Sequence, residues 1–264
     1  MIRLIATDMD GTLLDENREL PPDFDEVIVR LGEQKVYFAI ASGRSYATLK
    51  QQFCKYLEDL VFICDNGANV MYQQKCLNLS VIPKQLVEEV IHCCRKIGGK
   101  LLLCGTKATY HEYFGTEEAE GEIAHYYVNQ VMIEDNLTVQ DGIFKIAIYD
   151  EEAIEQHIYP ELKERFGDEL NIQISGAHWV DVMNPGVNKG AALRTIQEKL
   201  GISREETMSF GDYLNDYELL LEAKESYAMA NAHDKLKEIA AHIAPSNREQ
   251  GVMKVIRREL LLSE

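Results

Sequence analysis

Hydrophobic residues in the first third of the chain fall into short continuous runs that are separated by longer runs with a helical period. The continuous apolar runs cover residues 2–6, 35–41 and 60–64, and the helical patterns cover residues 21–31 and 46–57. Short apolar runs that alternate with helical patterns predict right-handed βαβ units. Such units predict a parallel sheet that is covered by helices on both faces.

After a predicted hairpin, residues 69–72 and 76–79, the pattern changes at Pro83. Strands and helices are now mixed, and the last pair of strands is joined by a short turn. This mixture predicts an α+β module with an antiparallel sheet. The expected helices cover residues 85–97, 117–129 and 151–166, and the expected strands cover residues 100–104, 108–113, 144–149, 170–175 and 178–183.

Regular alternation returns after Asn184-Pro185-Gly186, with helical patterns over residues 189–200, 216–223, 235–240 and 252–262 and strands over 207–210, 227–230 and 242–244. The simplest account is an α/β fold with one insertion. A doubly wound, Rossmann-like core with a parallel sheet is formed by residues 1–82 and 185–264. An α+β cap domain, residues 83–184, is inserted between these two parts.

Composition and charge limit the function classes. The chain has 264 residues, is 46% hydrophobic and carries a net charge of −17. A strongly acidic protein is a poor match for nucleic acids and for anionic membrane surfaces. Arg3 and Asp8 interrupt the N-terminal apolar run, which argues against a signal peptide. The 6 Cys form no C-x-x-C pair and lie in apolar stretches, as expected of reduced core thiols. We therefore expect a cytoplasmic protein with neither a membrane nor an obligate protein partner.

Candidate chemistry begins at the end of the first predicted strand, where Asp8 and Asp10 lie two positions apart. In an extended chain, side chains at i and i+2 point the same way, so these two carboxylates converge. Gly11 lets the backbone turn away directly afterwards. The pair suits a hard divalent cation together with a carboxylate nucleophile. A solvated Asp-rich turn is the ordinary alternative. A calcium-binding EF-hand loop is not indicated, because the further acidic ligands of such a loop are missing from this segment.

Three further polar segments follow or precede strand and helix ends of the predicted core. These are Ser-Gly-Arg at residues 42–44, Lys189 at a helix start, and Gly-Asp-Tyr-Leu-Asn-Asp at residues 211–216. Each alone is an ordinary turn, solvated lysine or helix cap. In a doubly wound sheet, however, the strand ends gather along one crevice, so these distant segments can meet.

The four segments resemble the signature of the haloacid dehalogenase-like superfamily, in its Cof-type (class IIB) phosphatase branch. The motifs are D-M-D-G-T at residues 8–12, S-G-R at 42–44, N-K-G at 188–190 and G-D-Y-L-N-D at 211–216, accompanied by N-G-A at 66–68 and N-x-x-x-G-V at 247–252. The resemblance covers essentially the whole chain. It implies a C2-type cap and a Mg²⁺-dependent phosphatase that acts on small phosphorylated metabolites, with sugar or polyol phosphates as the expected substrates.

The resemblance also implies roles for individual residues. Asp8 would be the nucleophile that forms an aspartyl phosphate, and Asp10 the general acid and base. Mg²⁺ would be held by Asp8, the main-chain carbonyl of Asp10 and Asp212. Asp216 would orient Lys189 or a metal-bound water. The groups expected to bind the phosphoryl oxygens are Met9, Ser42, Gly43, Lys189 and Asn215.

Contacts to the rest of the substrate are less well determined by the sequence. The candidates are Arg44, Asn66, His178 and Asp181, for which core packing or a solvated edge is the alternative. Two other functions also stay open. One is a phosphomutase on the same scaffold, and the other is a phosphometabolite-binding protein with reduced catalysis.

Overall fold

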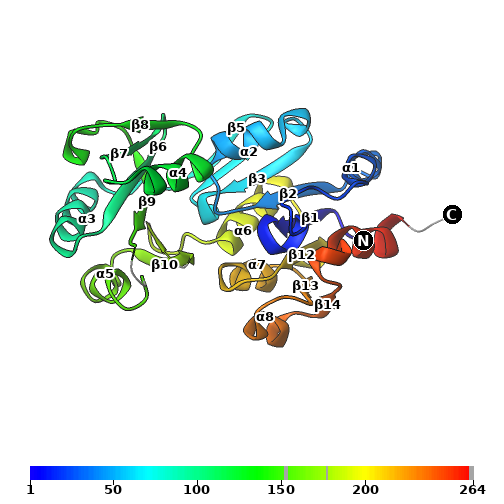
Figure 1. Cartoon of the computed structure of the whole chain (residues 1–264). Coiled ribbons are helices and arrows are strands. Elements are labelled where there is room, and N and C mark those ends of the chain that lie inside the picture. Colours follow the sequence, from blue (N-terminus) through cyan, green and yellow to red (C-terminus); the bar gives the residue numbers. More distant parts are fainter. Residues whose placement is uncertain (152–153, 177, 262–264) are drawn as a thin grey trace. The chain divides into compact units, whose positions relative to one another are not determined.

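The computed structural model describes residues 1–151, 154–176 and 178–261 (Figure 1). The chain divides into two compact units. The first unit contains Met1–Ser42, Phe53–Asn78 and the chain from Asn188 onward, and the second contains Gly43–Gln52 and Leu79–Val187.

The sheet of the first unit has eight strands in the order β14-β13-β12-β1-β2-β3-β4-β5. The pairs from β14 to β3 are parallel, and β3 pairs with β4 antiparallel. The strands are β1 (Leu4–Asp8), β2 (Tyr37–Ala41), β3 (Leu60–Cys64), β4 (Asn69–Tyr72), β5 (Lys75–Leu79), β12 (Thr207–Gly211), β13 (Glu225–Met229) and β14 (His242–Ala244).

Helices cover both faces of this sheet. One face buries alternate strand residues such as Leu4 and Ala39 against Leu193 of α6. On the other face, Phe24 of α1 contacts Phe38 of β2, with ring centroids 5.9 Å apart. The helices are α1 (Phe24–Glu33), α6 (Lys189–Leu200), α7 (Tyr217–Leu221), α8 (Asp234–Ile239) and α9 (Gly251–Ile256). Continuous burial of β1 and β3 follows from this double cover.

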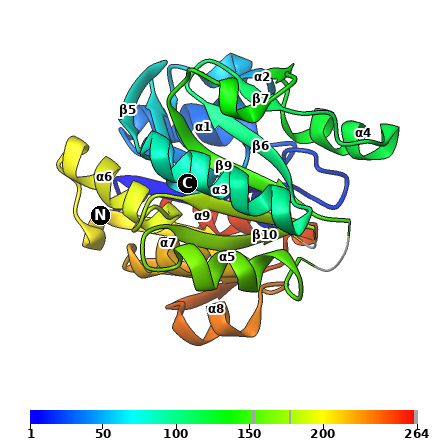
Figure 2. The same ribbon diagram turned by 90° about the vertical axis from the view of Figure 1, so that its left-hand side faces the viewer.

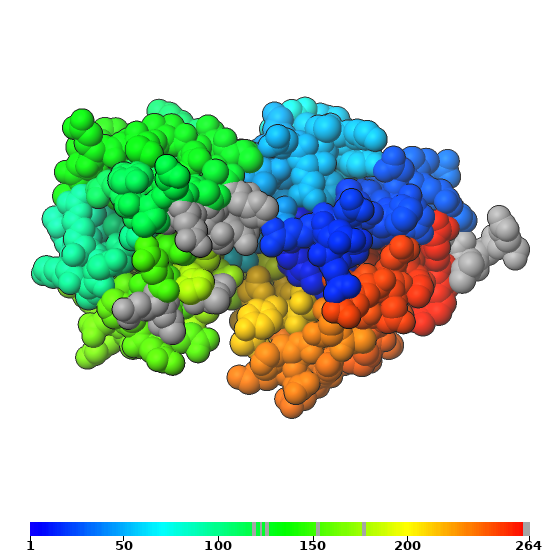
Figure 3. All heavy atoms as spheres, viewed as in Figure 1, coloured from blue at the N-terminus to red at the C-terminus, as the bar shows by residue number. Residues whose placement is uncertain are grey.

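The N-terminal and C-terminal parts of the first unit lie side by side, shown in blue and in orange to red in Figure 3. The side chain of Asn247 donates to the carbonyl of Leu14 at 2.9 Å, and Arg248 forms an ion pair with Glu16 at 2.5 Å. These contacts hold the turn that follows β1 against the start of α9.

The second unit is built on a six-stranded sheet in the order β10-β11-β9-β6-β7-β8. Its pairs are antiparallel except β7 with β8. The strands are β6 (Lys100–Gly105), β7 (Thr109–His111), β8 (Gln130–Met132), β9 (Ile143–Tyr149), β10 (Asn171–Gly176) and β11 (Trp179–Met183). Helices α3 (Lys84–Ile97) and α5 (Ile158–Phe166) lie on one side of this sheet (Figure 2). Their buried apolar residues share one core cluster with those of the sheet. Helices α2 (Tyr46–Gln52) and α4 (Glu117–Tyr126) complete the unit.

The observed elements differ from the sequence-based expectation in several places. The helix expected over 151–166 begins only at Ile158, because Pro160 then lies in its first turn, where proline is tolerated. Residues 152 and 153 of that expectation lie outside the described residues. The helix expected over 46–57 ends at Gln52 and is followed by a 3-10 turn, Cys54–Tyr56. Strand β8 was not expected, because its three residues are all exposed and show no alternation.

The long segment of the second unit, Leu79–Val187, extends a few residues beyond both ends of the expected cap, residues 83–184, and Gly43–Gln52, which was expected in the core, also groups with this unit. The two chain crossings bind to one another, which explains the shift. The amide Nδ2 of Asn184 donates to the hydroxyl of Ser80 and to the carbonyl of Val81, each at 2.9 Å.

Two other expectations concern the chain as a whole. All six cysteines are free thiols, but Cys54 and Cys76 are exposed, so the expectation of core thiols was wrong for these two. Within the described ranges, no helix is both long enough and apolar enough to cross a membrane.

Candidate active site

The carboxyl ends of neighbouring parallel strands bring the predicted site residues of the first unit together. Strand β1 ends at Asp8 and pairs with β12, which ends directly before Asp212. On the other side of β1, strand β2 ends directly before Ser42. Because parallel strands end at the same edge, segments that are some 200 residues apart meet there, as the hydrogen bond between Thr12 and Asp212 shows (separation 200).

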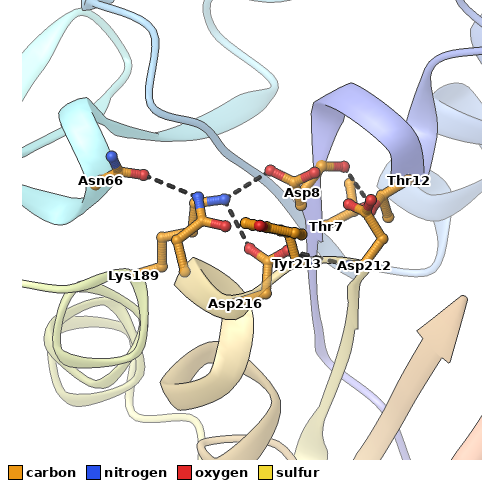
Figure 4. Close-up of polar contacts among 9 residues, drawn as sticks. Thr7, Asp8, Thr12, Asn66, Lys189, Asp212, Tyr213 and Asp216 are labelled. Atoms are coloured by element: carbon orange, nitrogen blue, oxygen red, sulfur yellow. Dashed lines mark hydrogen bonds and ion pairs between the residues drawn. The ribbon is translucent and has the colours of Figure 1, made fainter. Parts of the chain in front are cut away.

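Lys189 forms the centre of this site (Figure 4). Its side chain is fully buried, and its ammonium donates to Oδ1 of Asp8 at 2.6 Å and to Oδ1 of Asp216 at 2.7 Å. Asn188 begins the helix on which Lys189 lies, because its side-chain oxygen accepts from the amide of Ala191 at 2.7 Å. A lysine at the first helical position is otherwise unfavourable beside the helix dipole, so its two carboxylate partners account for its placement.

Burial and charge shift the protonation of these groups. Burial, followed by the neighbouring Asp216 carboxylate, holds the pKa of Asp8 well above its ordinary value. The same two causes raise the pKa of Asp212 to about 6. Burial by itself would lower the pKa of Lys189, but Asp216 and Asp8 outweigh it and raise that pKa above the ordinary lysine value. The site therefore contains one permanent cation, Lys189, whose single positive charge does not neutralise the carboxylates around it.

The carboxylates fit a divalent cation. Oxygens of Asp8, Asp212 and Asp216 lie within 4.8 Å of one another, close enough for carboxylate oxygens to hold a divalent cation such as Mg²⁺. Asp216 is already engaged, however. Its Oδ1 accepts from Lys189, and its Oδ2 accepts from the main-chain N–H of Asp212 at 3.1 Å and of Tyr213 at 3.3 Å. This arrangement favours Asp8 and Asp212 as the direct ligands and Asp216 as the group that orients Lys189.

Amide and hydroxyl side chains also gather at this strand edge. Ser42 is 2% exposed, and its carbonyl accepts from the main-chain N–H of Asn66 at 3.0 Å. Asn66 in turn accepts from Nδ2 of Asn215 at 3.2 Å. The structure thus brings Ser42, Asn66 and Asn215 to the same strand edge as the acidic cluster, where hydrogen-bond donors for phosphoryl oxygens are needed.

The other predicted site residues are placed as follows. Asp10 is exposed, two residues beyond Asp8, and the Met9 side chain is buried. Gly43 and Arg44 group with the second unit, where Arg44 donates to the Gln52 side chain at 3.1 Å.

Two further candidates lie in the second unit. His178 is exposed and contacts the carbonyl of Asp150 through Nδ1 at 3.0 Å. Asp181 is buried on β11, with its Oδ2 3.9 Å from the ammonium of Lys145. Their proposed contacts with substrate stay predictions.

Sequence reasoning assigned no role to two residues that position Asp212 and its neighbouring turn. The hydroxyl of Thr12 donates to Oδ1 of Asp212 at 2.9 Å, and Nδ2 of Asn231 donates to the carbonyl of Gly11 at 2.8 Å. Thr12 lies inside the D-M-D-G-T motif. Asn231 follows the end of β13, another strand of the parallel core. The sequence feature that could have indicated its role is therefore a polar residue just after a core strand.

Gly67 fixes the start of α6 and provides a test of this geometry. Its φ is +100°, and a Cβ built there would lie 2.3 Å from the carbonyl oxygen of Asn188. We expect Gly67→Ala to displace Lys189, lowering kcat/KM, and to cost more free energy of unfolding than the roughly 1–2 kcal/mol of a left-handed backbone. Gly98→Ala is the matched control, because φ there is +80° but no atom lies within 4 Å of the added Cβ. Equal losses of stability and activity in the two variants would contradict this explanation.

Comparison with known proteins gives one consistent result. The family model described as haloacid dehalogenase-like hydrolase matches residues 5–256. The phosphatase YbjI of Escherichia coli, named for 5-amino-6-(5-phospho-D-ribitylamino)uracil, is 29% identical over 98% of this chain and 96% of its own. An HMP-PP phosphatase of Citrobacter koseri is 26% identical over 92% of this chain and 90% of its own.

A solved structure extends the similarity to the whole fold. The crystal structure of SMU.1108c from Streptococcus mutans superimposes with a TM-score of 0.91 at 28% identity, covering 99% of this chain and 100% of that chain. The expected doubly wound fold and the expected family are thereby confirmed. With its motif residues gathered at one edge of a parallel sheet, this chain belongs to the haloacid dehalogenase-like hydrolases and is a phosphatase of the Cof type.

Proposed function

We propose that the protein is a Mg²⁺-dependent phosphomonoester hydrolase that works through an aspartyl phosphate on Asp8. The observation that supports this most strongly is the placement of the fully buried Lys189 ammonium 2.6 Å from Asp8 and 2.7 Å from Asp216. Burial and Asp216 raise the pKa of Asp8, but Lys189 acts against them and lowers it, and so favours the ionised carboxylate, which is the nucleophilic form.

The proposed reaction has two displacements at phosphorus. In the first, a carboxylate oxygen of Asp8 bonds to phosphorus and the bond to the ester oxygen breaks, while Asp10 donates a proton to the departing alcohol. In the second, Asp10 takes a proton from water as that water attacks phosphorus. The bond between phosphorus and Asp8 breaks, which releases inorganic phosphate and regenerates the Asp8 carboxylate. Asp10 suits both transfers because it is exposed, two residues from Asp8.

The positive charge needed at the phosphoryl group comes from two sources in this proposal. Lys189 supplies one fixed charge. Mg²⁺, bound by Asp8, Asp212 and the main-chain carbonyl of Asp10, would neutralise phosphoryl oxygens as a Lewis acid. The amides and hydroxyls of Ser42, Gly43, Met9 and Asn215 would take up the remaining charge through hydrogen bonds.

Mg²⁺ binding should depend on pH in a defined way. Because the pKa of Asp212 is about 6 in the folded, metal-free protein and 3.8 ordinarily, the folded state holds a proton that the unfolded state releases between these values. The metal-free protein therefore loses stability as pH rises through about 4 to 6, and bound metal offsets this loss.

We accordingly expect the increase in melting temperature caused by Mg²⁺ to be large at pH 8 and small at pH 5. The comparison variant is Asp212→Asn, in which the Mg²⁺-induced increase should be small at both pH values. Thermal unfolding with and without Mg²⁺, and with a chelator, measures this. An equal Mg²⁺ effect at both pH values in the unaltered protein would contradict the assignment of Asp212 as a ligand.

Small phosphorylated metabolites, and sugar or polyol phosphates in particular, are the proposed substrates. The Escherichia coli relative is named for a substrate with a phosphorylated ribityl group, which is a polyol phosphate. The net charge of −17 disfavours polynucleotides at long range.

A panel assay for released phosphate tests the substrate class. We expect pentose, hexose and polyol phosphates to be hydrolysed with higher kcat/KM than a phosphopeptide or a 5′-phosphorylated oligonucleotide. A preference for the macromolecules would contradict the small-metabolite proposal, although the phosphatase chemistry would stand. Isomerised sugar phosphate in place of free phosphate would identify a phosphomutase, and tight binding without turnover would identify a phosphometabolite-binding protein.

We place the reaction in the cytoplasm. All six thiols are free, and Cys93, Cys94 and Cys104 are buried in the second unit, as is usual for proteins of reducing compartments.

A further inference from the structure

A lysine is buried within the apolar strand β9 of the second unit, and the proposed reaction does not use it. Lys145 is only 1% exposed. Its neighbour Ile146 belongs to the core cluster that α3 and α5 share, so Lys145 points to the opposite face of the sheet. Asp181 of β11 lies on that same face, because its neighbour Val180 also belongs to this core cluster.

The ammonium of Lys145 contacts a main-chain carbonyl, a carboxylate and an aromatic ring. Nζ donates to the carbonyl of Gly43 at 3.1 Å. It also lies 3.9 Å from Oδ2 of Asp181 and 5.4 Å from the ring centre of Tyr127. A buried ion pair seldom adds stability over apolar side chains of similar volume, because both charges lose their water. Stability therefore does not explain a lysine at this position, and the bond to Gly43 becomes the informative contact.

The bond to Gly43 restrains the Ser-Gly-Arg segment. Gly43 is the first residue of the second unit, so the bond from Lys145 lies within that unit. Glycine rotates easily about both of its backbone bonds, and the peptides on its two sides need separate restraints. The peptide before Gly43 is fixed because the carbonyl of Ser42 accepts from the N–H of Asn66 at 3.0 Å, and the peptide after it is fixed by Lys145. Since each peptide is planar, the two bonds together set the directions of the N–H groups of Gly43 and Arg44.

We propose that Lys145 is a positioning residue for phosphoryl binding, because its bond to Gly43 holds the Ser-Gly-Arg segment in the conformation that receives the phosphoryl oxygens. This inference rests on the proposed function, in which Ser42 and the N–H of Gly43 bind these oxygens. Donors stabilise developing charge best when they are already in place and need not move during the reaction. Lys145 itself does not touch the substrate, and Asp181 supplies the negative charge beside it.

Lys145→Met tests the proposal, because it removes the donor and keeps an unbranched side chain. The segment binds the phosphoryl group, which all substrates share. We therefore expect kcat/KM to fall by the same factor for a hexose phosphate and for para-nitrophenyl phosphate. A displacement of about 1 Å can cost about 10²-fold in rate, which sets the scale of this loss. The inhibition constant of inorganic phosphate should rise about tenfold, the scale of one hydrogen bond to a charged group.

Three further variants complete the experiment. Lys145→Arg keeps the charge and the N–H donors, so it should recover at least part of the lost activity. Lys100→Met is the control and should leave both quantities unaltered, because Lys100 lies on the neighbouring strand β6 and pairs with Glu151. The double variant Lys145→Met/Asp181→Leu leaves neither of the two charges unpaired. It should therefore fold even if Lys145→Met does not, and it should show the same losses.

Thermal unfolding establishes which variants are folded at the assay temperature. The proposal is overturned if folded Lys145→Met, or the double variant, retains the kcat/KM of the unaltered protein, since the buried pair would then serve only the fold. It is also overturned if the loss is confined to the hexose phosphate, since the pair would then bind the leaving group. If the unaltered protein hydrolyses neither substrate, the proposed function itself is contradicted, and the inference with it.

Discussion

Asp8→Asn is expected to lower kcat on the order of 10⁶-fold, the scale of losing a covalent nucleophile. The change keeps the shape of the side chain and removes one negative charge from a cluster in which Asp8, Asp212 and Asp216 lie within 4.8 Å. Because burial and, after it, the neighbouring Asp216 carboxylate raise the pKa of Asp8, the metal-free variant should be at least as stable as the unaltered protein. Release of phosphate from a sugar phosphate and thermal unfolding measure the two effects.

Asp59→Asn, a change of the same kind at an exposed position of the first unit, is the control and should leave kcat unaltered. Asp10→Ala should behave differently from both, because it slows proton transfer by about 10²–10⁴-fold without removing the nucleophile. In that variant a phosphorylated protein should accumulate and be visible in its intact mass. Substantial turnover by Asp8→Asn would contradict the covalent mechanism.

Among the substitutions proposed for the site, we expect Lys189→Met to cause the largest loss in the free energy of unfolding. We expect it to lower kcat strongly as well. The substitution removes the cation between Asp8 and Asp216 while keeping an unbranched side chain of similar length. Breaking a buried ion pair by removing one partner typically costs about 3–5 kcal/mol of free energy of unfolding. Loss of a preorganised charge at the phosphoryl group adds a decrease in kcat on the order of 10²–10³-fold.

The loss of stability should itself depend on pH. Lys189 lowers the pKa of Asp8, so without Lys189 this pKa lies still further above its value in the unfolded state. Folding then favours the protonated form of Asp8, so the destabilisation should be small near pH 4 and should grow as pH rises. Lys199→Met, an exposed change on the same helix, is the control. A loss of stability in Lys189→Met that is independent of pH would contradict the charge explanation.

Local sequence patterns predicted the strands and helices of the core well where they agreed with tertiary packing. Strand β3 and helix α6 have the expected bounds, because a five-residue apolar run and a helix with Asn188 at one end and Gly201 at the other leave little alternative. Strand β8 could not be predicted, because its pairing with β7 is formed by main-chain groups and leaves no apolar pattern. The register of the strand pairs could not be predicted for the same reason, because main-chain hydrogen bonds leave no pattern in the sequence.

The candidate site was predictable to the extent that strand ends reveal it. Asp8, Lys189, Asp212 and Asp216 could be named because their segments occur together at strand ends and helix starts in the order of the family signature, although each segment alone has an ordinary structural explanation. The sequence does not reveal that Asp216 is engaged through both oxygens, since this depends on the path of the main chain at Asp212.

The position of β1 in its sheet has a consequence for how the protein is synthesised. One neighbour, β2, follows within the same N-terminal stretch, whereas the other, β12, begins only at Thr207. On the ribosome, β1 to β5 are complete long before β12 emerges, so one edge of β1 stays open while most of the second unit is made. An open apolar strand edge invites pairing with other chains. We therefore expect truncated or stalled nascent chains that end before residue 207 to aggregate, and correct folding to depend on the last quarter of the chain closing that edge.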